Sequence, residues 1–397
     1  MTLFDAADTG RSPHTVLLLA GTRPEAARLA PVASALAGAG RIVGITVATG
    51  PDPILVHEAL EALGRPPDIT LLLVERPRGE VALAAALAVR IDQLLDEMHP
   101  SAVLVTGGGI CAVMAAQVAF WRQIPVVYLE PGFQAREQLC PFPDGGNRRV
   151  VGQLTSLFLR VSDEPSPAVP DGPNAITVGD TLTGTADTPT ARDDADGGVG
   201  KPLDVALNDP ALAELVTRAR AGTTRIVLLD AAARSLVEVS GPLLEAHPDV
   251  EIVFLGARRA PLRDQPRARA LAHCGLSDLV GLLLVSTLAA TDRSSACRES
   301  VDFGLPTLLV DDAYWIEPGA ERNPTVDRRV VTAERGSALA ALTRLLAAYP
   351  SGAARWPDLA ASARAEHALA WMFGLEPEPE PVGAGPSTTA IAPSIED

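Results

Sequence analysis

Short apolar runs that alternate with Ala- and Leu-rich stretches constrain the fold of this chain more than any other feature. Such runs suit buried parallel strands, and helices connect parallel strands across the two faces of a sheet. The pattern therefore predicts an α/β protein with doubly wound parallel sheets. In the first half the expected strands are 15–20, 42–48, 102–106, 125–129 and 175–178, and the expected helices are 24–38, 54–64, 80–98 and 109–122.

The same alternation starts again after a segment rich in Pro, Gly, Asp and Thr at 187–204, which breaks every periodicity and indicates a linker or a long surface loop. We expect two Rossmann-like domains, 14–186 and 205–372, that face each other across a cleft in a GT-B-like arrangement, with ligands at the carboxyl ends of the strands. In the second half the expected strands are 225–230, 250–256, 279–285 and 306–312, and the expected helices are 233–246, 262–273, 292–303, 337–348 and 357–372.

Both ends of the chain differ in composition from these domains. Residues 1–13 are expected to be a flexible N-terminus, and residues 373–397 form an acidic, Pro-rich stretch that predicts a disordered tail. The last helix, 357–372, is the one element of the second half that we expect could return to the first domain.

Charge and composition exclude several classes of function. The net charge of −16 argues against a nucleic-acid partner, whose phosphates require a basic surface. No apolar run reaches the ~20 residues that span a bilayer, and the first residues lack the features of a secretory signal. The four cysteines (Cys111, Cys140, Cys274 and Cys297) have no metal-binding spacing, so neither a metal site nor a disulfide framework is expected. These observations together predict a cytoplasmic protein without a membrane partner.

An arginine stands at the junction of the first expected strand and helix, in the stretch "GTRPEAARLAP" at 21–31. Gly21 permits a tight turn, Pro24 suits the first turn of a helix, and Glu25 complements the positive helix dipole. Arg23 therefore lies at the carboxyl end of a strand beside a helix N-terminus, which is a common place for an anion to bind. A surface arginine in a local salt bridge is the alternative.

This stretch resembles the start of the UDP-N-acetylglucosamine 2-epimerase family, and five further stretches resemble family elements in the right order. Together they cover roughly residues 14–350, and an ordered series of matches is far more specific than any one of them. The five are "AVLVTGGG" (102–109), "IPVVYLEPG" (124–132), "CPFPDGGNRRVVGQLTSLFL" (140–159), "AITVGDTLTGTA" (175–186) and "TDRSSACRESVDFGLPTLLV" (291–310).

The resemblance implies a GT-B-like fold, a UDP-sugar ligand and no nicotinamide or other cofactor. In the family, UDP leaves the anomeric carbon as a proton leaves carbon 2, and re-addition gives the manno epimer, while some members let water capture the intermediate. Such chemistry needs an acid and a base beside the sugar, and donors for the departing diphosphate. The family is usually homodimeric.

Several family positions are retained. The resemblance assigns proton transfer to Glu130, and to Asp144 where the family has a glutamate. It assigns substrate or nucleotide binding to Arg23, Asn147, Arg148 and Glu299. Arg293, Ser294 and Ser295 replace a Ser-Gly-Gly element, and their hydroxyl, guanidinium and backbone groups could still bind an anion.

Other family positions are changed. Gly108 stands at a family aspartate and Thr106 at a histidine, while Ala231, Ala232 and Ala233 replace a histidine and two arginines. One strand–helix segment is also expected to be missing between 282–286 and Thr291.

Two functions therefore remain open. The first is an enzyme that acts on a nucleotide-linked sugar by elimination, epimerisation or hydrolysis. The second is an inactive homologue that binds a sugar nucleotide or pairs with an active paralogue in a heteromer. Glycosyl transfer is a third, by analogy of fold alone.

Overall fold

The structure is a computed structural model of the 397-residue chain. It describes residues 13–73, 77–129, 144–161, 174–179, 181, 209–230, 232–257, 261–262, 265–272, 276–291, 300, 305–310, 330–333, 337–348 and 359–379. The described residues up to 181 and those at 359–379 form one compact unit, unit 1, and the described residues from 209 to 348 form a second, unit 2. The predicted linker at 187–204 lies outside the described residues, as do residues 1–12 and 380–397.

Unit 1 is built on a seven-stranded sheet in which every neighbouring pair is parallel, in the order β3-β2-β1-β4-β5-β6-β7. The order reverses at β1, where Val16 pairs with Gly44 of β2 on one side and with Ala102 of β4 on the other. This is the topology of a doubly wound sheet. The strands are β1 (His14–Ala20), β2 (Ile42–Ala48), β3 (Ile69–Thr70), β4 (Ala102–Thr106), β5 (Val126–Leu129), β6 (Leu157–Arg160) and β7 (Ala175–Thr177).

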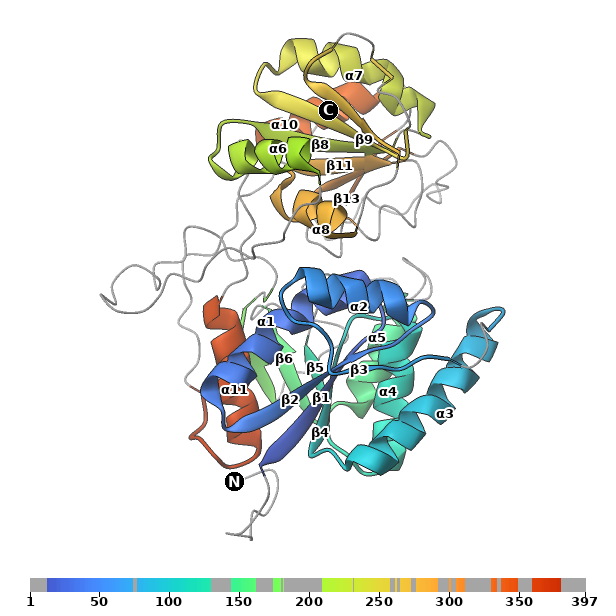
Figure 1. Cartoon of the computed structure of the whole chain (residues 1–397), viewed down its shortest axis with the longest axis vertical. Coiled ribbons are helices and arrows are strands. Elements are labelled where there is room, and N and C mark those ends of the chain that lie inside the picture. The colour runs from blue at the N-terminus through green and yellow to red at the C-terminus, as the bar shows by residue number, and fades with distance from the viewer. Residues whose placement is uncertain are drawn as a thin grey trace, which may run out of the picture. The chain divides into compact units, whose positions relative to one another are not determined.

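Helices cover both faces of this sheet (Figure 1). On one face α3 (Glu80–Met98), α4 (Ile110–Trp121) and α5 (Asp144–Leu154) pack side by side. On the other face α1 (Arg23–Ala39) contacts α2 (Pro53–Ala62) and α11 (Leu359–Met372).

The chain thus returns to unit 1 through α11, its last described helix. Phe373 follows this helix and stacks on His14 at the start of β1, with ring centroids 4.4 Å apart. Phe373 is also the first residue of the stretch 373–397, which the composition predicts to be a disordered tail.

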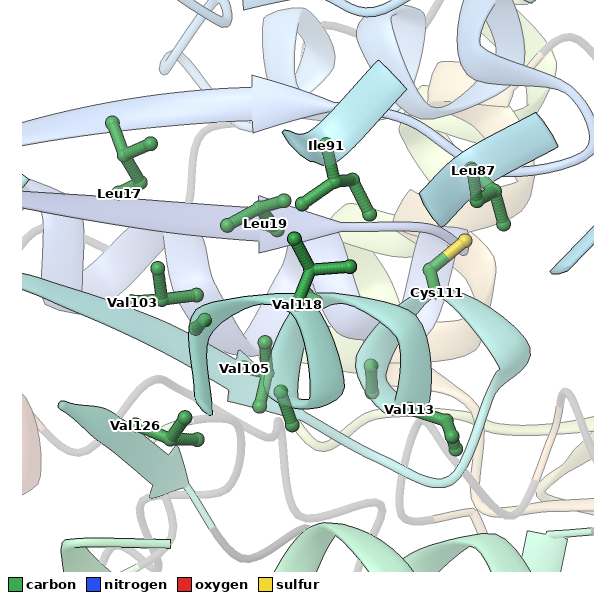
Figure 2. Packing of buried hydrophobic residues seen from close by; sticks show 14 of the residues in the cluster. Leu17, Leu19, Leu87, Ile91, Val103, Val105, Cys111, Val113, Val118 and Val126 are labelled. Atoms are coloured by element: carbon green, nitrogen blue, oxygen red, sulfur yellow. The ribbon is translucent and has the colours of Figure 1, made fainter. Parts of the chain in front are cut away.

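The core of unit 1 is made of small and medium aliphatic side chains (Figure 2). Leu17 and Leu19 of β1 and Val103 and Val105 of β4 pack against the face of α3 and α4 that carries Leu87, Ile91 and Val118. Because the chain is only 4% aromatic, close packing of Ala, Val and Leu provides most of the buried area.

Unit 2 repeats the design with a six-stranded parallel sheet in the order β10-β9-β8-β11-β12-β13. Its strands are β8 (Arg225–Asp230), β9 (Val250–Leu255), β10 (Ala268–Leu271), β11 (Leu288–Thr291), β12 (Thr307–Val310) and β13 (Val330–Ala333). Its helices are α6 (Pro210–Arg220), α7 (Arg234–Ala246), α8 (Leu276–Val285) and α10 (Ala338–Ala348). The predicted class, α/β with doubly wound parallel sheets, is confirmed.

Two predicted elements of unit 2 are wrong. The run 279–285 was expected to be a strand but forms most of α8, because a segment that is apolar on all sides has no periodicity to separate a buried helix from a strand. The stretch 262–273 was expected to be a helix but contains the edge strand β10. Between 282–286 and Thr291, where we expected a strand–helix segment to be missing, the chain passes directly from the end of α8 into β11.

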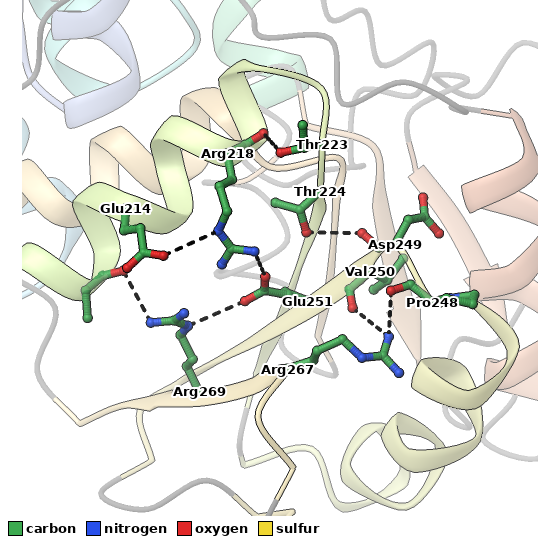
Figure 3. A network of polar contacts seen from close by, with 11 residues as sticks. Glu214, Arg218, Thr223, Thr224, Pro248, Asp249, Val250, Glu251, Arg267 and Arg269 are labelled. Carbon is green, nitrogen blue, oxygen red and sulfur yellow. Dashed lines mark hydrogen bonds and ion pairs between the residues drawn. The ribbon is translucent and has the colours of Figure 1, made fainter.

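Charged side chains fix the β9–β10 edge of unit 2 (Figure 3). The Glu251 carboxylate is buried and pairs with Arg218 of α6 and, at 3.5 Å, with Arg269 of β10. Arg267 donates to the carbonyl oxygens of Leu244, at 2.6 Å, and of Val250, at 3.1 Å. These contacts belong to the scaffold, since they tie α6, α7 and two strands together away from the sheet's point of reversal.

Candidate functional site

The turn from β1 into α1 holds Arg23 as the first residue of the helix, with its side chain half-buried. Thr22 is the N-cap, and its Oγ1 accepts from the backbone N–H of Glu25 at 3.4 Å. The Glu25 side chain bends back, so that its Oε2 accepts from the N–H of Gly21 at 2.7 Å. Glu25 is only 6% exposed and fixes the turn through this bond, whereas Arg23 is half-buried.

The loop between β4 and α4 lies against the same carboxylate. A Cβ atom on Gly107 or on Gly109 would be 2.9 Å from Glu25 Oε1, and Gly107 has a φ of +80°. Only glycine therefore allows the loop to approach the carboxylate this closely. The loop is held from above as well: Tyr128 OH donates to the Gly107 carbonyl at 3.1 Å, and Asn147 Nδ2 donates to the Gly108 carbonyl at 2.8 Å.

The segment after β2 completes this tight arrangement. Gly50 has a φ of +104°, and a Cβ atom on it would lie 2.3 Å from the carbonyl oxygen of Gly21. A Cβ atom on Gly21 would in turn lie 2.4 Å from Sγ of Cys111, in the first turn of α4. The segments that follow β1 and β2 thus approach each other through their backbones at the carboxyl edge of the sheet, and the segment after β4 packs against the β1–α1 turn through the side chains of Cys111 and Glu25.

Cys111 is buried behind this edge, and burial raises the pKa of its thiol well above the ordinary value, with further contributions from the charges of Glu25 and Glu80. The neutral thiol is the stable form in this environment. Cys111 therefore packs as a small apolar side chain and does not act as a nucleophile.

The structure brings two of the predicted site residues to this edge. Arg23 starts α1, and Asn147, in the first turns of α5, reaches the β4–α4 loop. Arg148 follows Asn147 and is 6% exposed. Asp144 is the first residue of α5, and its side chain is outside the described part of the chain. The other predicted site residues also lie outside the described residues: Glu130, Arg293, Ser294, Ser295 and Glu299.

Sequence reasoning missed the two residues that organise this edge, Glu25 and Tyr128. Glu25 was interpreted as a partner of its own helix dipole, and Tyr128 was counted as part of a strand. The run of three glycines at 107–109 was the available signal, because adjacent glycines after a strand indicate that another group approaches the backbone closely.

The corresponding edge of unit 2 carries an acid. Asp230 ends β8, and its two carboxylate oxygens accept from the N–H of Ala232 at 3.1 Å and from Thr291 Oγ1, at the end of β11, at 3.0 Å. Ala233 is the N-cap of α7 and supplies no side-chain cap. Ala232 and Ala233, which stand at arginine positions of the resembled family, thus form a short turn that the Asp230 carboxylate stabilises. Within the described residues, no three His, Cys, Asp or Glu side chains are grouped so as to hold a metal ion.

Two doubly wound parallel sheets in succession, with a last helix that returns to the first unit, define a two-domain α/β protein of the GT-B-like class. The family model for UDP-N-acetylglucosamine 2-epimerase matches residues 36–166. A probable UDP-N-acetylglucosamine 2-epimerase from Ralstonia nicotianae is 25% identical over 376 residues, which cover 85% of this chain and 96% of the relative. The chain is therefore similar to the UDP-N-acetylglucosamine 2-epimerase family, through this family model and through relatives that match most of its length.

Solved structures agree with this fold. A putative UDP-N-acetylglucosamine 2-epimerase from Listeria monocytogenes superposes with a TM-score of 0.65 at 19% identity, over 94% of this chain and 99% of the other. The Methanocaldococcus jannaschii UDP-GlcNAc 2-epimerase, in complex with UDP-GlcNAc and UDP, superposes with a TM-score of 0.61 at 17% identity, over 90% of this chain and 99% of the other.

Among the helices that the structure describes, none has both the length and the apolar character that a membrane span requires.

Proposed function

We propose that this protein binds a UDP-sugar of the UDP-N-acetylglucosamine type at the carboxyl edge of the unit 1 sheet, with Arg23 on the diphosphate. The observation that carries the proposal is the arrangement around the point of reversal, where Arg23 starts α1 and Asn147 reaches the β4–α4 loop. The carboxyl edge at a reversal of strand order is where open α/β sheets bind ligands. Similarity to the UDP-N-acetylglucosamine 2-epimerase family and the UDP-GlcNAc bound by the Methanocaldococcus protein support the choice of ligand.

In the enzymatic form of this proposal, Glu130 and Asp144 are the acid and base. One carboxylate takes the proton from carbon 2 while the C1–O bond breaks and its electron pair leaves with UDP. Re-addition of UDP to carbon 1, with a proton delivered to the opposite face of carbon 2 by the second carboxyl group, gives the epimer. Addition of the water oxygen to carbon 1, with a proton returned to carbon 2, gives the free sugar. Arg23 and Arg148 offer positive charge, Asn147 offers hydrogen bonds, and in unit 2 Arg293, Ser294, Ser295 and Glu299 are the proposed nucleotide-binding residues.

A second candidate function is a sugar-nucleotide-binding subunit without catalytic activity. Two observations favour it. Gly108 provides no carboxylate at the centre of the edge, and its carbonyl already accepts from Asn147. In unit 2, alanine stands at position 232, where the resemblance places a family arginine, and its backbone N–H donates to the Asp230 carboxylate. Loss of a general base typically costs ~10²–10⁴ in rate.

Activity and binding assays separate these functions. UDP-N-acetylglucosamine is incubated with the wild type and with Glu130→Gln, and proton NMR follows the manno epimer, free sugar and UDP. Turnover by the wild type that falls at least about 100-fold in the variant supports the enzyme. Micromolar binding without turnover supports the binding subunit, and absence of both contradicts the proposal.

The assembly we propose is a homodimer, or a heteromer with a paralogue, acting in the cytoplasm. Light scattering after size-exclusion chromatography gives the mass of the purified protein directly. A mass near twice the 41.3 kDa of one chain supports the homodimer, whereas a monomer that gains mass only with a co-expressed paralogue supports the heteromer.

A further inference from the structure

We infer that Glu25 is a positioning residue that couples the Arg23 turn to the Gly107–Gly109 loop and thereby sets the affinity for the UDP-sugar. The inference rests on the proposed function for its ligand. Its structural part, the coupling of two loops by one buried carboxylate, can be tested without any ligand.

The coupling follows from the reach of one side chain between two chain segments. Glu25 Oε2 accepts from the N–H of Gly21, at the start of its own turn, at 2.7 Å. The other oxygen, Oε1, lies against Gly107 and Gly109, closely enough that a Cβ atom on either would be 2.9 Å away. About 80 residues separate these segments in the sequence, and the carboxylate is what lies between them.

The position of Oε1 is also favourable for a negative charge. Gly109 is the N-cap of α4 and has no side chain with which to cap it, so the first N–H groups of that helix depend on other groups. A carboxylate at a helix N-terminus is stabilised by the helix dipole. Glu25 therefore anchors the start of α4 to the start of α1, on the two sides of the reversal at β1.

The coupling extends to the remaining residues of the edge. The Gly107 carbonyl accepts from Tyr128, and the Gly108 carbonyl accepts from Asn147 of α5. Glu25 and Asn147 therefore contact the same loop. Because Glu25 is 6% exposed, it acts through this loop and through the Arg23 turn. It is a positioning residue and is distinct from the acid and base.

The test compares Glu25→Gln with Glu366→Gln. Glutamine keeps the length of the side chain and one oxygen acceptor but removes the charge. Glu366 is a matched control, since it is a buried glutamate of the same unit, 4% exposed, that pairs with Arg41 at the opposite, amino-terminal edge of β2. Hydrogen exchange is followed in peptides covering 20–26 and 105–113, and titration calorimetry measures the affinity for UDP and UDP-N-acetylglucosamine.

We expect Glu25→Gln to speed exchange in both peptides and to weaken UDP-N-acetylglucosamine binding about tenfold. Glu25→Asp, which keeps the charge on a shorter side chain, is expected to restore part of the protection from exchange and part of the affinity. Glu366→Gln should leave exchange at 105–113 and the affinity unchanged, even if it lowers the melting temperature as much.

Two results would overturn the inference. Unchanged exchange at 105–113 in Glu25→Gln removes the coupling, whatever the ligand does. Equal loss of affinity in both variants makes Glu25 an ordinary stabilising residue. If the wild type binds neither nucleotide while the exchange result holds, the proposed function fails and the affinity claim fails with it, but the coupling of the two loops stands.

Discussion

At the scale of single residues, four glycines define the carboxyl edge of the unit 1 sheet. Gly21, Gly50, Gly107 and Gly109 each face another group at a distance that leaves no room for a Cβ atom. Backbone approaches of this kind occur where a ligand or another loop must come close to the chain. The glycines therefore belong to the architecture of the site as much as Arg23 does.

Gly50→Ala tests this reading of the glycines. The new Cβ would lie 2.3 Å from the Gly21 carbonyl oxygen at a φ of +104°, so we expect a loss of at least about 2 kcal/mol in the free energy of unfolding. Gly38→Ala is the control, because Gly38 is exposed in α1 and no atom lies within 4 Å of its added Cβ. That change should stabilise the protein by up to ~1 kcal/mol. Urea unfolding measures both, and similar effects at the two positions would contradict the account.

Cys111 gives the stability a specific pH dependence. Its thiol pKa is raised in the folded protein, whereas the unfolded chain has an ordinary thiol pKa of about 8.5. The unfolded state therefore loses this proton first as the pH rises, and stability falls above about pH 8.5 by up to ~1.4 kcal/mol per pH unit until the folded pKa is reached.

The measurement is urea unfolding of the wild type and Cys111→Ala at pH 7.5 and pH 9.5. The variant is expected to be less stable at pH 7.5, because it loses buried contacts, and the difference should shrink at pH 9.5. A difference that stays the same at both pH values would mean that the thiol pKa is not raised by folding.

At the scale of elements, the sequence predicts those with a clear pattern and fails at those without one. The runs 42–48, 80–98 and 225–230 match β2, α3 and β8, because a short apolar run marks each of the two strands and helical periodicity marks the helix. The run 279–285 is apolar on every side and forms part of α8, and the four-residue strands β10 and β11 carry too few residues to show a period. In such segments the packing against neighbours decides the conformation.

In the candidate site, too, local sequence predicts some features and not others. The position of Arg23 at a strand end and helix start follows from Gly21 and Pro24, and it was predicted from them. The contact of Glu25 with Gly107 and Gly109 depends on the order of strands in the sheet, which brings residues distant in sequence together, and no local pattern contains it.

An ion pair that is buried on one side links α11 to the start of β2. Arg41 Nε lies 3.1 Å from Glu366 Oε1, and its guanidinium also pairs with Glu376. Arg41→Ala leaves the Glu366 carboxylate, 4% exposed, without this partner, so we expect a loss of about 1–3 kcal/mol in the free energy of unfolding.

Arg122→Ala is the control for this change. Arg122 pairs with Asp92 and Asp96 on the solvent-exposed surface of α3, where it lowers the pKa of Asp92. Water and salt screen such pairs, so the unfolding midpoint should hardly move. Equal shifts of the unfolding midpoint for the two variants would show that the contact of Arg41 with α11 stabilises the protein no more than an exposed ion pair does.

At the scale of the whole molecule, the chain builds the same doubly wound design twice and places different chemistry at the two points of strand reversal. In unit 1 the reversal carries Arg23 above a buried glutamate, and in unit 2 it carries Asp230 bonded to Thr291. The solved structures of similar proteins share this architecture. We expect the residues at the reversals to set what the protein binds, and we propose that the arginine contacts the diphosphate.

The measurement that tests this assignment most directly is calorimetric titration of UDP-N-acetylglucosamine into the wild type, Arg23→Ala and Arg122→Ala. Arg122 lies at the C-terminal end of α4, which is the end of that helix far from the carboxyl edge of the sheet. We expect micromolar binding that weakens at least about tenfold in Arg23→Ala and is unchanged in Arg122→Ala. No binding by the wild type, or equal binding by all three proteins, would contradict it.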